Sequence, residues 1–87
     1  MVAIPTVHMN GTSYDELMRQ VLDAHKAVQV ASIVIQDMAP NGRDYYPQGD
    51  AALAAATAEH RDRRNKLESI LEELEDITRG IRNQKRR

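Results

Sequence analysis

The residues best suited to chemistry near the start of the chain lie in a short turn, from His8 to Tyr14. Its sequence, HMNGTSY, places a glycine and two hydroxyl side chains directly before the expected start of a helix. Free backbone N–H groups and the positive end of the helix dipole make such a turn a ready anion site. Tyr14 adds a ring face on which a base could stack. A capping turn without a ligand explains Ser13 and Glu16 equally well, so both interpretations stay open.

A second set of polar side chains interrupts the apolar rows of the two expected helices. His25 stands in the row of the first helix, and His60 and Arg63 continue the row of the second helix backward at heptad spacing. If the chain folds back symmetrically about Tyr45, His25 comes to lie near Arg63 and Arg64. We therefore expect these groups to gather at one level of the hairpin.

Buried cations without a partner cost several kcal/mol, so these groups need water, a carboxylate or an anionic ligand. One interpretation is a solvated stretch where the helices separate, or pairing with Glu59 and Asp62. The other is a pocket between chains, lined by His and Arg, that receives phosphate groups. The sequence alone does not decide between them.

Signals for an enzyme are weak. The chain has no cysteine, no glycine-rich phosphate loop and no HExxH motif, and its three histidines lack the spacing of a zinc protease. We therefore expect no catalytic residue, no metal site and no cofactor.

The elements that must position these residues are helices. Ser13 and Glu16 form the pattern of a capping box at a helix start, while Pro40 and the turn-forming pair Asn41-Gly42 end that helix. Asp50 is suited to cap a second helix, which opens with an alanine-rich stretch. The predicted divisions are an N-terminal arm (1–12), a helical hairpin domain (13–83) with helices at about 13–39 and 50–83 joined by a loop (40–49), and a basic tail (84–87).

The second helix carries an apolar row with heptad spacing, which predicts a partner helix. Its members are Leu67, Ile70, Leu74, Ile77 and Ile81. The apolar stripe of the first helix is wider than one partner helix needs. Because a chain this short buries little on its own, we predict an all-α fold in which helical hairpins assemble into a homo-oligomeric helical bundle.

The loop between the helices holds Tyr45 and Tyr46, two of the three aromatic residues. Their rings either cover the open end of the hairpin or form a contact surface. The charged residues of the second helix alternate in basic and acidic blocks, which is typical of a solvated face.

Composition limits the partners. The 87 residues include 12 Lys and Arg against 13 Asp and Glu, a net charge of −1, so no overall field attracts a nucleic-acid polymer or an anionic membrane. We expect no DNA or RNA polymer as a ligand, no membrane contact, no signal peptide and, with no cysteine, a reducing cytoplasm.

Two motifs also support a resemblance. HMNGTSYDELMRQ, an alanine-rich stretch, PNGRDYYPQG and EHRDR together resemble a set of short phage and prophage proteins, over about residues 8–77. Among all-helical proteins of this size, the chain looks most like the phage anti-CBASS cyclic-nucleotide sponges. The turn at Asn10, Gly11 and Thr12 matches by motif position, as does one arginine of the second helix. Position 9 is Met where the family would stack a base on an aromatic ring, which leaves Tyr14 as its substitute.

The resemblance implies a homo-oligomer, with a hexamer as one form, that works in the host cytoplasm. Such a protein binds cyclic di- or trinucleotides without cleaving them and keeps the host's abortive-infection effectors silent. A small coiled-coil structural or scaffold protein of a phage is the alternative. The candidate ligand-binding residues are His8, Asn10, Gly11, Thr12, Ser13, Tyr14, His25, Lys26, His60, Arg61, Arg63 and Arg64.

Overall fold

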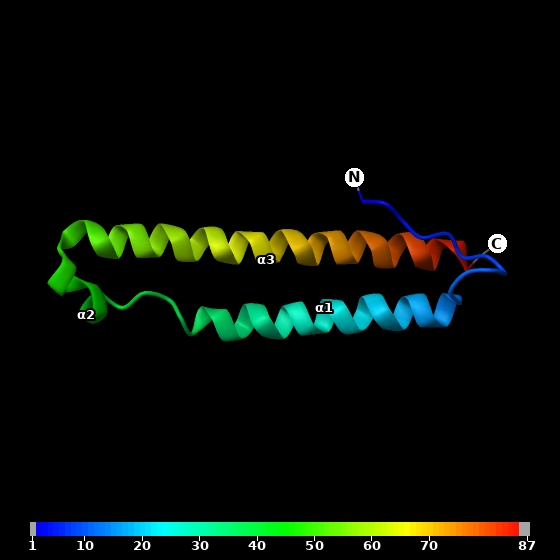
Figure 1. Ribbon diagram of the computed structural model, residues 1–87, viewed down its shortest axis with the longest axis horizontal. Helices are drawn as coiled ribbons and strands as arrows, with labels where there is room; N and C mark the ends of the chain where they lie inside the picture. Colours follow the sequence, from blue (N-terminus) through cyan, green and yellow to red (C-terminus); the bar gives the residue numbers. More distant parts are fainter. Residues whose placement is uncertain (1, 86–87) are drawn as a thin grey trace.

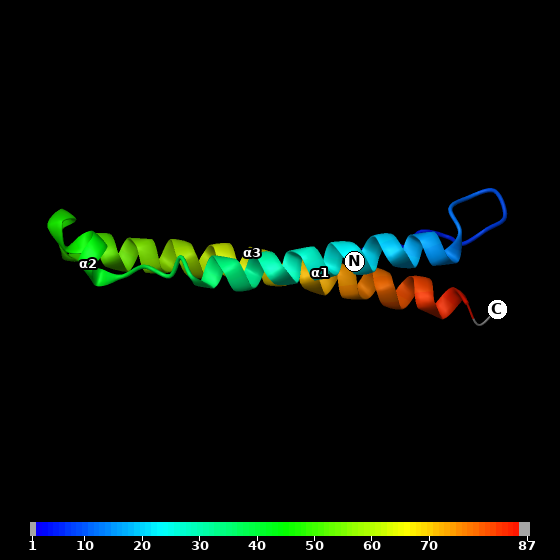
Figure 2. The same cartoon turned by 90° about the horizontal axis from the view of Figure 1, so that it is seen from below.

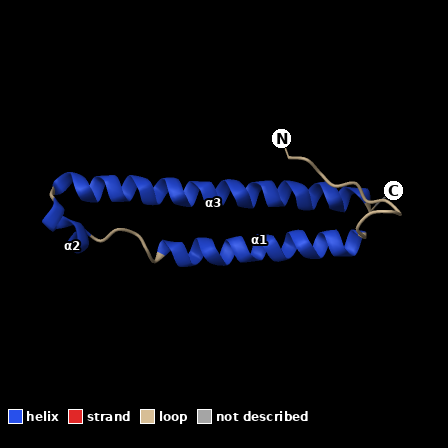
Figure 3. Ribbon diagram, in the orientation of Figure 1, coloured by secondary structure: helices blue, strands red, loops and turns tan. Residues whose placement is uncertain are grey.

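The computed structural model describes residues 2–85, and every regular element in that range is helical. The elements are α1 (Tyr14–Gln36), α2 (Gly42–Tyr45), the 3-10 helix η1 (Tyr46–Gln48) and α3 (Asp50–Gln84), shown in Figure 3. Helices α1 and α3 lie antiparallel and side by side (Figure 1). The prediction of an all-α chain built on two long helices is therefore confirmed. Met1 of the predicted arm and Arg86 and Arg87 of the predicted tail lie outside the described residues.

Helix α1 begins at a side-chain cap. The Ser13 hydroxyl accepts a hydrogen bond of 3.1 Å from the Glu16 backbone N–H, which satisfies one donor of the first turn. The reciprocal half of the predicted capping box does not form, because the Glu16 carboxylate accepts hydrogen bonds from Arg19 and Gln20 instead. The hydrogen bonds from Arg19 lower the pKa of Glu16 below its ordinary value.

The connection between the long helices is not symmetrical. Helix α1 ends at Gln36, three residues before the predicted end, and the chain then runs alongside the first turns of α3 before it turns back (Figures 1 and 2). A Cβ on Gly42 would lie 3.7 Å from the Leu53 side chain, which shows how closely this connection packs on α3. Gly49 has φ 102°, a value that side chains disfavour, and it serves as the N-cap of α3 in place of Asp50.

This asymmetry shifts the pairing of α1 with α3. His25 lies opposite Glu75, about three helical turns further along α3 than a symmetrical loop predicts. The prediction that His25 lies near Arg63 and Arg64 is wrong. The physical reason is that the first turns of α3 pack on the connection, so that only its later turns remain for α1.

The contact between the helices is thin. The buried apolar side chains are those of Val21, Leu71 and Ile81, and Thr78 is buried with them. The row that faces α1 therefore passes through Leu71 and Thr78, one position beyond the Ile70 and Ile77 of the predicted row. The heptad spacing itself is kept, because both rows repeat every seven residues.

The N-terminal arm docks on the flank of α3. The Gln84 side chain holds it with two bonds: its oxygen accepts from the Val7 backbone N–H at 2.8 Å, and its amide donates to the Pro5 carbonyl at 2.8 Å. Ile4 lies over Gly80, where a Cβ would come within 2.7 Å of the Ile4 side chain. Glycine in the middle of a helix costs about 1 kcal/mol relative to alanine, and this close approach explains its presence.

The molecule is a rod of 61 × 22 × 18 Å. Its radius of gyration is 18.8 Å, whereas a compact domain of this length has about 12 Å. Its accessible surface is 6796 Å², against about 5,200 Å² for a compact monomer of the same mass. A single chain therefore leaves about 1,600 Å² exposed beyond what a compact fold would.

Candidate functional site

The predicted site residues fall into two groups that one chain does not bring together. The turn from His8 to Ser13 projects from the end of the hairpin at which α3 finishes (Figure 2). The arginines Arg61 and Arg64 lie beside Ser32, which is eighteen residues along α1 from Tyr14. At a rise of 1.5 Å per residue, these two levels are separated by about 27 Å.

The turn itself is partly explained by local structure. The Gly11 backbone N–H donates to the His8 carbonyl at 3.2 Å, and the His8 ring covers Gly11 so closely that a Cβ would lie 2.7 Å from His8 Nε2. Ser13 caps α1. The side chains of Asn10 and Thr12 are exposed and make no hydrogen bond with the rest of residues 2–85. Capping therefore accounts for Ser13 but leaves two polar side chains without an internal role.

Tyr14, the predicted stacking face, is already in use. The Lys85 ammonium lies 5.0 Å from the centre of its ring, within the range of a cation–π contact. A base that stacks on this face must displace the lysine.

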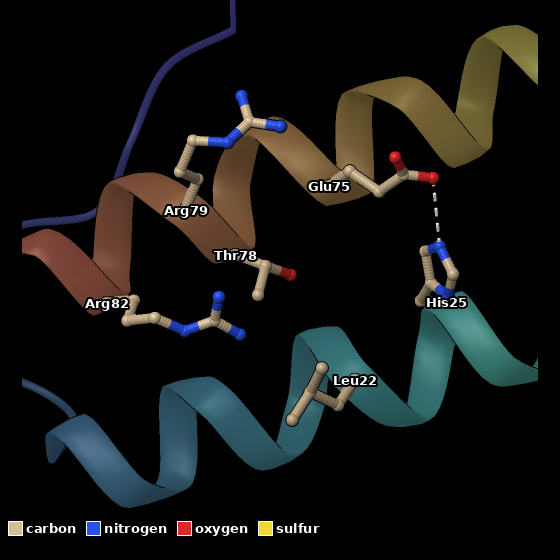
Figure 4. Close-up of a pocket in the computed structure, with 6 residues that line it drawn as sticks. All are labelled: Leu22, His25, Glu75, Thr78, Arg79 and Arg82. Atoms are coloured by element: carbon tan, nitrogen blue, oxygen red, sulfur yellow. Dashed lines mark hydrogen bonds and ion pairs between the residues drawn. The ribbon is translucent and has the colours of Figure 1, made fainter.

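His25 lines a hollow of about 240 Å³ between α1 and α3 (Figure 4). Its Nε2 lies 3.2 Å from a Glu75 carboxylate oxygen. The other lining residues are Leu22, Thr78, Arg79 and Arg82. Glu75 faces His25, and Arg79 pairs with Asp76 at 3.0 Å. Of the two arginines that line this hollow, only Arg82 has no carboxylate partner among the described residues.

A second hollow, of about 210 Å³, holds two arginines that both lack a carboxylate partner among the described residues. It is lined by Ser32, Arg61, Arg64, Asn65 and Glu68. Arg61 and Arg64 are three residues apart on α3 and so share one face. Neither guanidinium pairs with a carboxylate among the described residues. Two free guanidinium groups beside a hydroxyl and an amide can donate several hydrogen bonds to phosphate oxygens, and they outnumber the one carboxylate of the hollow, that of Glu68.

Arg63 belongs to a different surface. It lines a shallow hollow with Glu59, Asp62 and Lys66, where the opposite charges balance. This arrangement matches the interpretation that acidic neighbours accompany Arg63. Lys26 is exposed on α1 and lines none of the three hollows.

His60 is the most unusual of the predicted residues. Its side chain is buried on the face of α3 that is turned to the rest of the hairpin, with a residue exposure of 7%. Both ring nitrogens lack a hydrogen-bond partner within residues 2–85. Leaving a buried polar group without a partner costs about 1–3 kcal/mol. The folded chain therefore carries an energetic penalty at this position.

Sequence reasoning missed several residues that line the hollows of His25 and of Arg61. Ser32, Asn65 and Glu68 surround Arg61 and Arg64, while Thr78, Arg79 and Arg82 share the hollow of His25. Ser32 gave a signal, since it interrupts an apolar row. Asn65 and Glu68 lie one helical turn after Arg61 and Arg64 on the same helix. The meeting of Thr78, Arg79 and Arg82 with His25 depends on how α1 pairs with α3, and a symmetrical loop predicts a pairing about three turns away.

Residues 2–85 hold no cluster of three His, Asp or Glu side chains arranged for a metal ion. None of the helices in that part of the chain combines the length and apolar character needed to cross a bilayer. Comparison with protein families, curated proteins and solved structures found no match.

Proposed function

We propose that this protein binds cyclic oligonucleotide messengers and sequesters them without cleavage, as a self-associated helical bundle in the cytoplasm of a phage-infected host. The observation that carries the proposal is the pair of free guanidinium groups of Arg61 and Arg64 in one hollow. A cyclic di- or trinucleotide presents two or three phosphates on a compact ring. Neighbouring arginines suit such a ligand because each guanidinium can donate two parallel hydrogen bonds to one phosphate.

Two further features support the proposal. The resemblance to anti-CBASS sponges rests on the turn around Asn10 and Thr12, whose side chains have no internal hydrogen bond within the described residues. Sequestration also needs no nucleophile, general base or metal, in keeping with the sequence, which offers no catalytic motif. Repeated sites in a symmetric assembly would supply many phosphate contacts from few residues.

The test is a thermal-shift titration with a panel of cyclic dinucleotides and trinucleotides, using the linear dinucleotides as control ligands. Binding to the folded state at a hundred times Kd adds about 2.7 kcal/mol, which for a chain of this size raises Tm by roughly 10 °C or more. Ligand recovered after heat denaturation should be chemically intact. No shift with any cyclic nucleotide would reject the proposal.

A pair of double variants localises the site. Arg61→Ala with Arg64→Ala removes both free guanidinium groups and should abolish the thermal shift. Arg63→Ala with Lys66→Ala removes the same charge from the same helix but from the other hollow, and should keep it. Equal losses in both double variants would mean that only the overall charge of α3 matters.

A second candidate function is that of a small coiled-coil scaffold or interaction protein of a phage. The observation that favours it is the set of large apolar side chains left exposed on α1, among them Val30, Ile33 and Val34. Such a protein would purify with virion components and would show no thermal shift with any nucleotide.

A further inference from the structure

Helix α1 carries a second apolar row that does not face α3. We call it the outer row; its members are Ala24, Ala27, Ala31, Val34 and Met38, the last lying just past the helix end. Their spacing of 3, 4, 3 and 4 residues is that of a coiled-coil seam. All five are exposed, Val34 by 58% and Met38 by 65%. A seam of this kind with no helix against it is an unfilled contact.

The flanks of the outer row are apolar as well. Val30, beside the row, is 52% exposed, and Ile33, on the opposite side of α1 near Gln29, is 63% exposed. From Ala27 to Gln36 the helix contains no charged residue. In contrast, the side of α1 that faces α3 carries Val21, which is buried, and Val28, which is half-buried, together with the polar His25 and Ser32. Helix α1 is thus apolar on nearly all sides in its second half, as expected for a helix buried in an assembly.

We propose that the outer row is the contact with a second copy of this chain, with the two α1 helices packed antiparallel about Ala31. Small and large residues then complement each other. The side chains of the row become larger along the helix, from alanine at its start to Val34 and Met38 at its end. Antiparallel pairing about its centre sets Ala24 beside Met38 of the second copy and Ala27 beside Val34 of the second copy, whereas parallel pairing would set large against large.

The area of the surface fits this occupant. The rod exposes about 1,600 Å² more than a compact monomer of the same mass. A standard protein–protein contact buries about 800 Å² on each partner. One antiparallel contact along α1 would therefore bury about half of this additional exposed surface on each chain. The other half is enough for contacts with further copies.

The pairing also bears on where a ligand would bind. The identity of that ligand rests on the proposed function, whereas the contact between the two α1 helices does not. Tyr14 lies seventeen residues before Ala31, about 25 Å along the axis. Antiparallel pairing brings the turn of one copy level with α2 and η1 of the other, because that connection lies a similar distance beyond Ala31. Tyr46 of one copy, which is 76% exposed, then lies at the same end of the pair as Tyr14 of the other copy. The ring face of that Tyr14 is covered by Lys85 of its own chain.

Single-cysteine crosslinking tests the pairing directly, since the chain has no cysteine of its own. A disulfide needs Cα atoms within about 7 Å. Ala31→Cys should therefore form covalent dimers under mild oxidation. Ala24→Cys alone should not, because its two copies would lie about 21 Å apart along the axis. A mixture of Ala24→Cys and Met38→Cys proteins should crosslink to each other.

Two crosslinking results would overturn the pairing. Efficient dimers of Ala24→Cys alone would indicate parallel helices. A yield for Ala31→Cys no higher than that for Gln29→Cys, an exposed position on the opposite side of α1, would reject the outer row as a contact.

Mass measurement by light scattering gives an independent test and separates the pairing from the proposed function. Ala31→Glu should lower the oligomer mass at least twofold, while Gln29→Glu, which adds the same charge on the opposite side, should leave it unchanged. Circular dichroism checks that both variants keep their helices. Crosslinked dimers that bind no cyclic nucleotide would reject the function and keep the contact. An Ala31→Glu protein of unchanged mass would reject the contact whatever the ligand titration shows.

Discussion

Replacing His60 with leucine should stabilise the folded chain, although it changes a buried residue. The residue is only 7% exposed, both ring nitrogens are buried, and neither has a hydrogen-bond partner in the part of the chain that the structure describes. Removing such an unsatisfied group recovers its desolvation cost, about 1–3 kcal/mol. Leucine has a similar volume and fills the space with apolar atoms. At roughly 4–8 °C per kcal/mol for a chain of this size, Tm should rise by at least about 4 °C.

The assay is thermal and urea denaturation of both proteins at several concentrations, because self-association makes Tm depend on concentration. His25→Leu is the matched control. It removes a histidine that has a partner, Glu75 at 3.2 Å, at a partly exposed site, so its effect should be a loss of at most about 1 kcal/mol. If His60→Leu instead lowered stability, the His60 nitrogens would have a partner in solution. Such a loss would contradict an unsatisfied burial of His60.

Three further predictions concern the arm and the start of α1. Gly80→Ala should place a methyl group against Ile4 and release the arm, seen as faster hydrogen exchange at the Val7 amide while α3 keeps its helicity; unchanged protection would contradict the close packing. Ser13→Ala should cost about 1 kcal/mol in urea denaturation, since it removes the cap of α1, and a neutral effect would mean that water replaces the hydroxyl. Because Arg19 lowers the pKa of Glu16 in the folded chain, this pair should add stability at neutral pH that is lost as the pH falls below 4.5, the ordinary pKa of a glutamate. Glu16→Gln should therefore flatten the acidic part of the stability–pH profile. An unchanged profile would count against a contribution from this pair.

Local signals in the sequence were sufficient to predict the two long helices and the approximate positions of their ends. The cap at Ser13, the restriction that Pro40 places on the preceding residue and the alanine-rich stretch after Asp50 are effects of a few neighbouring residues. They locate the helix ends to within a few positions, although Gly49 and not the predicted Asp50 is the N-cap of α3. The heptad spacing of the second helix likewise follows from its own sequence. It does not say which of two adjacent apolar rows faces α1, because Ile70 and Leu71 both repeat every seven residues.

The pairing of the helices depends on the connection, and its shape is not a local property. A symmetrical loop about Tyr45 would have set His25 opposite Arg64, whereas the packing of Gly42 close to Leu53 uses the first turns of α3. Ser32, the residue of α1 that lines the hollow of Arg61, is set by that register. The burial of His60 was equally hidden, because a histidine in an apolar row does not reveal whether it finds a partner.

The docking of the arm has a consequence for the exposed turn that follows it. Val7 is fixed to Gln84 on one side of the turn, and Ser13 is fixed as the cap of α1 on the other. A bridge of five residues between two anchored ends samples far fewer conformations than a free chain terminus. The entropy of ordering Asn10 and Thr12 is therefore largely lost during folding and need not be lost again when another molecule arrives. A peptide with the same turn but without α3 would lack this preorganisation.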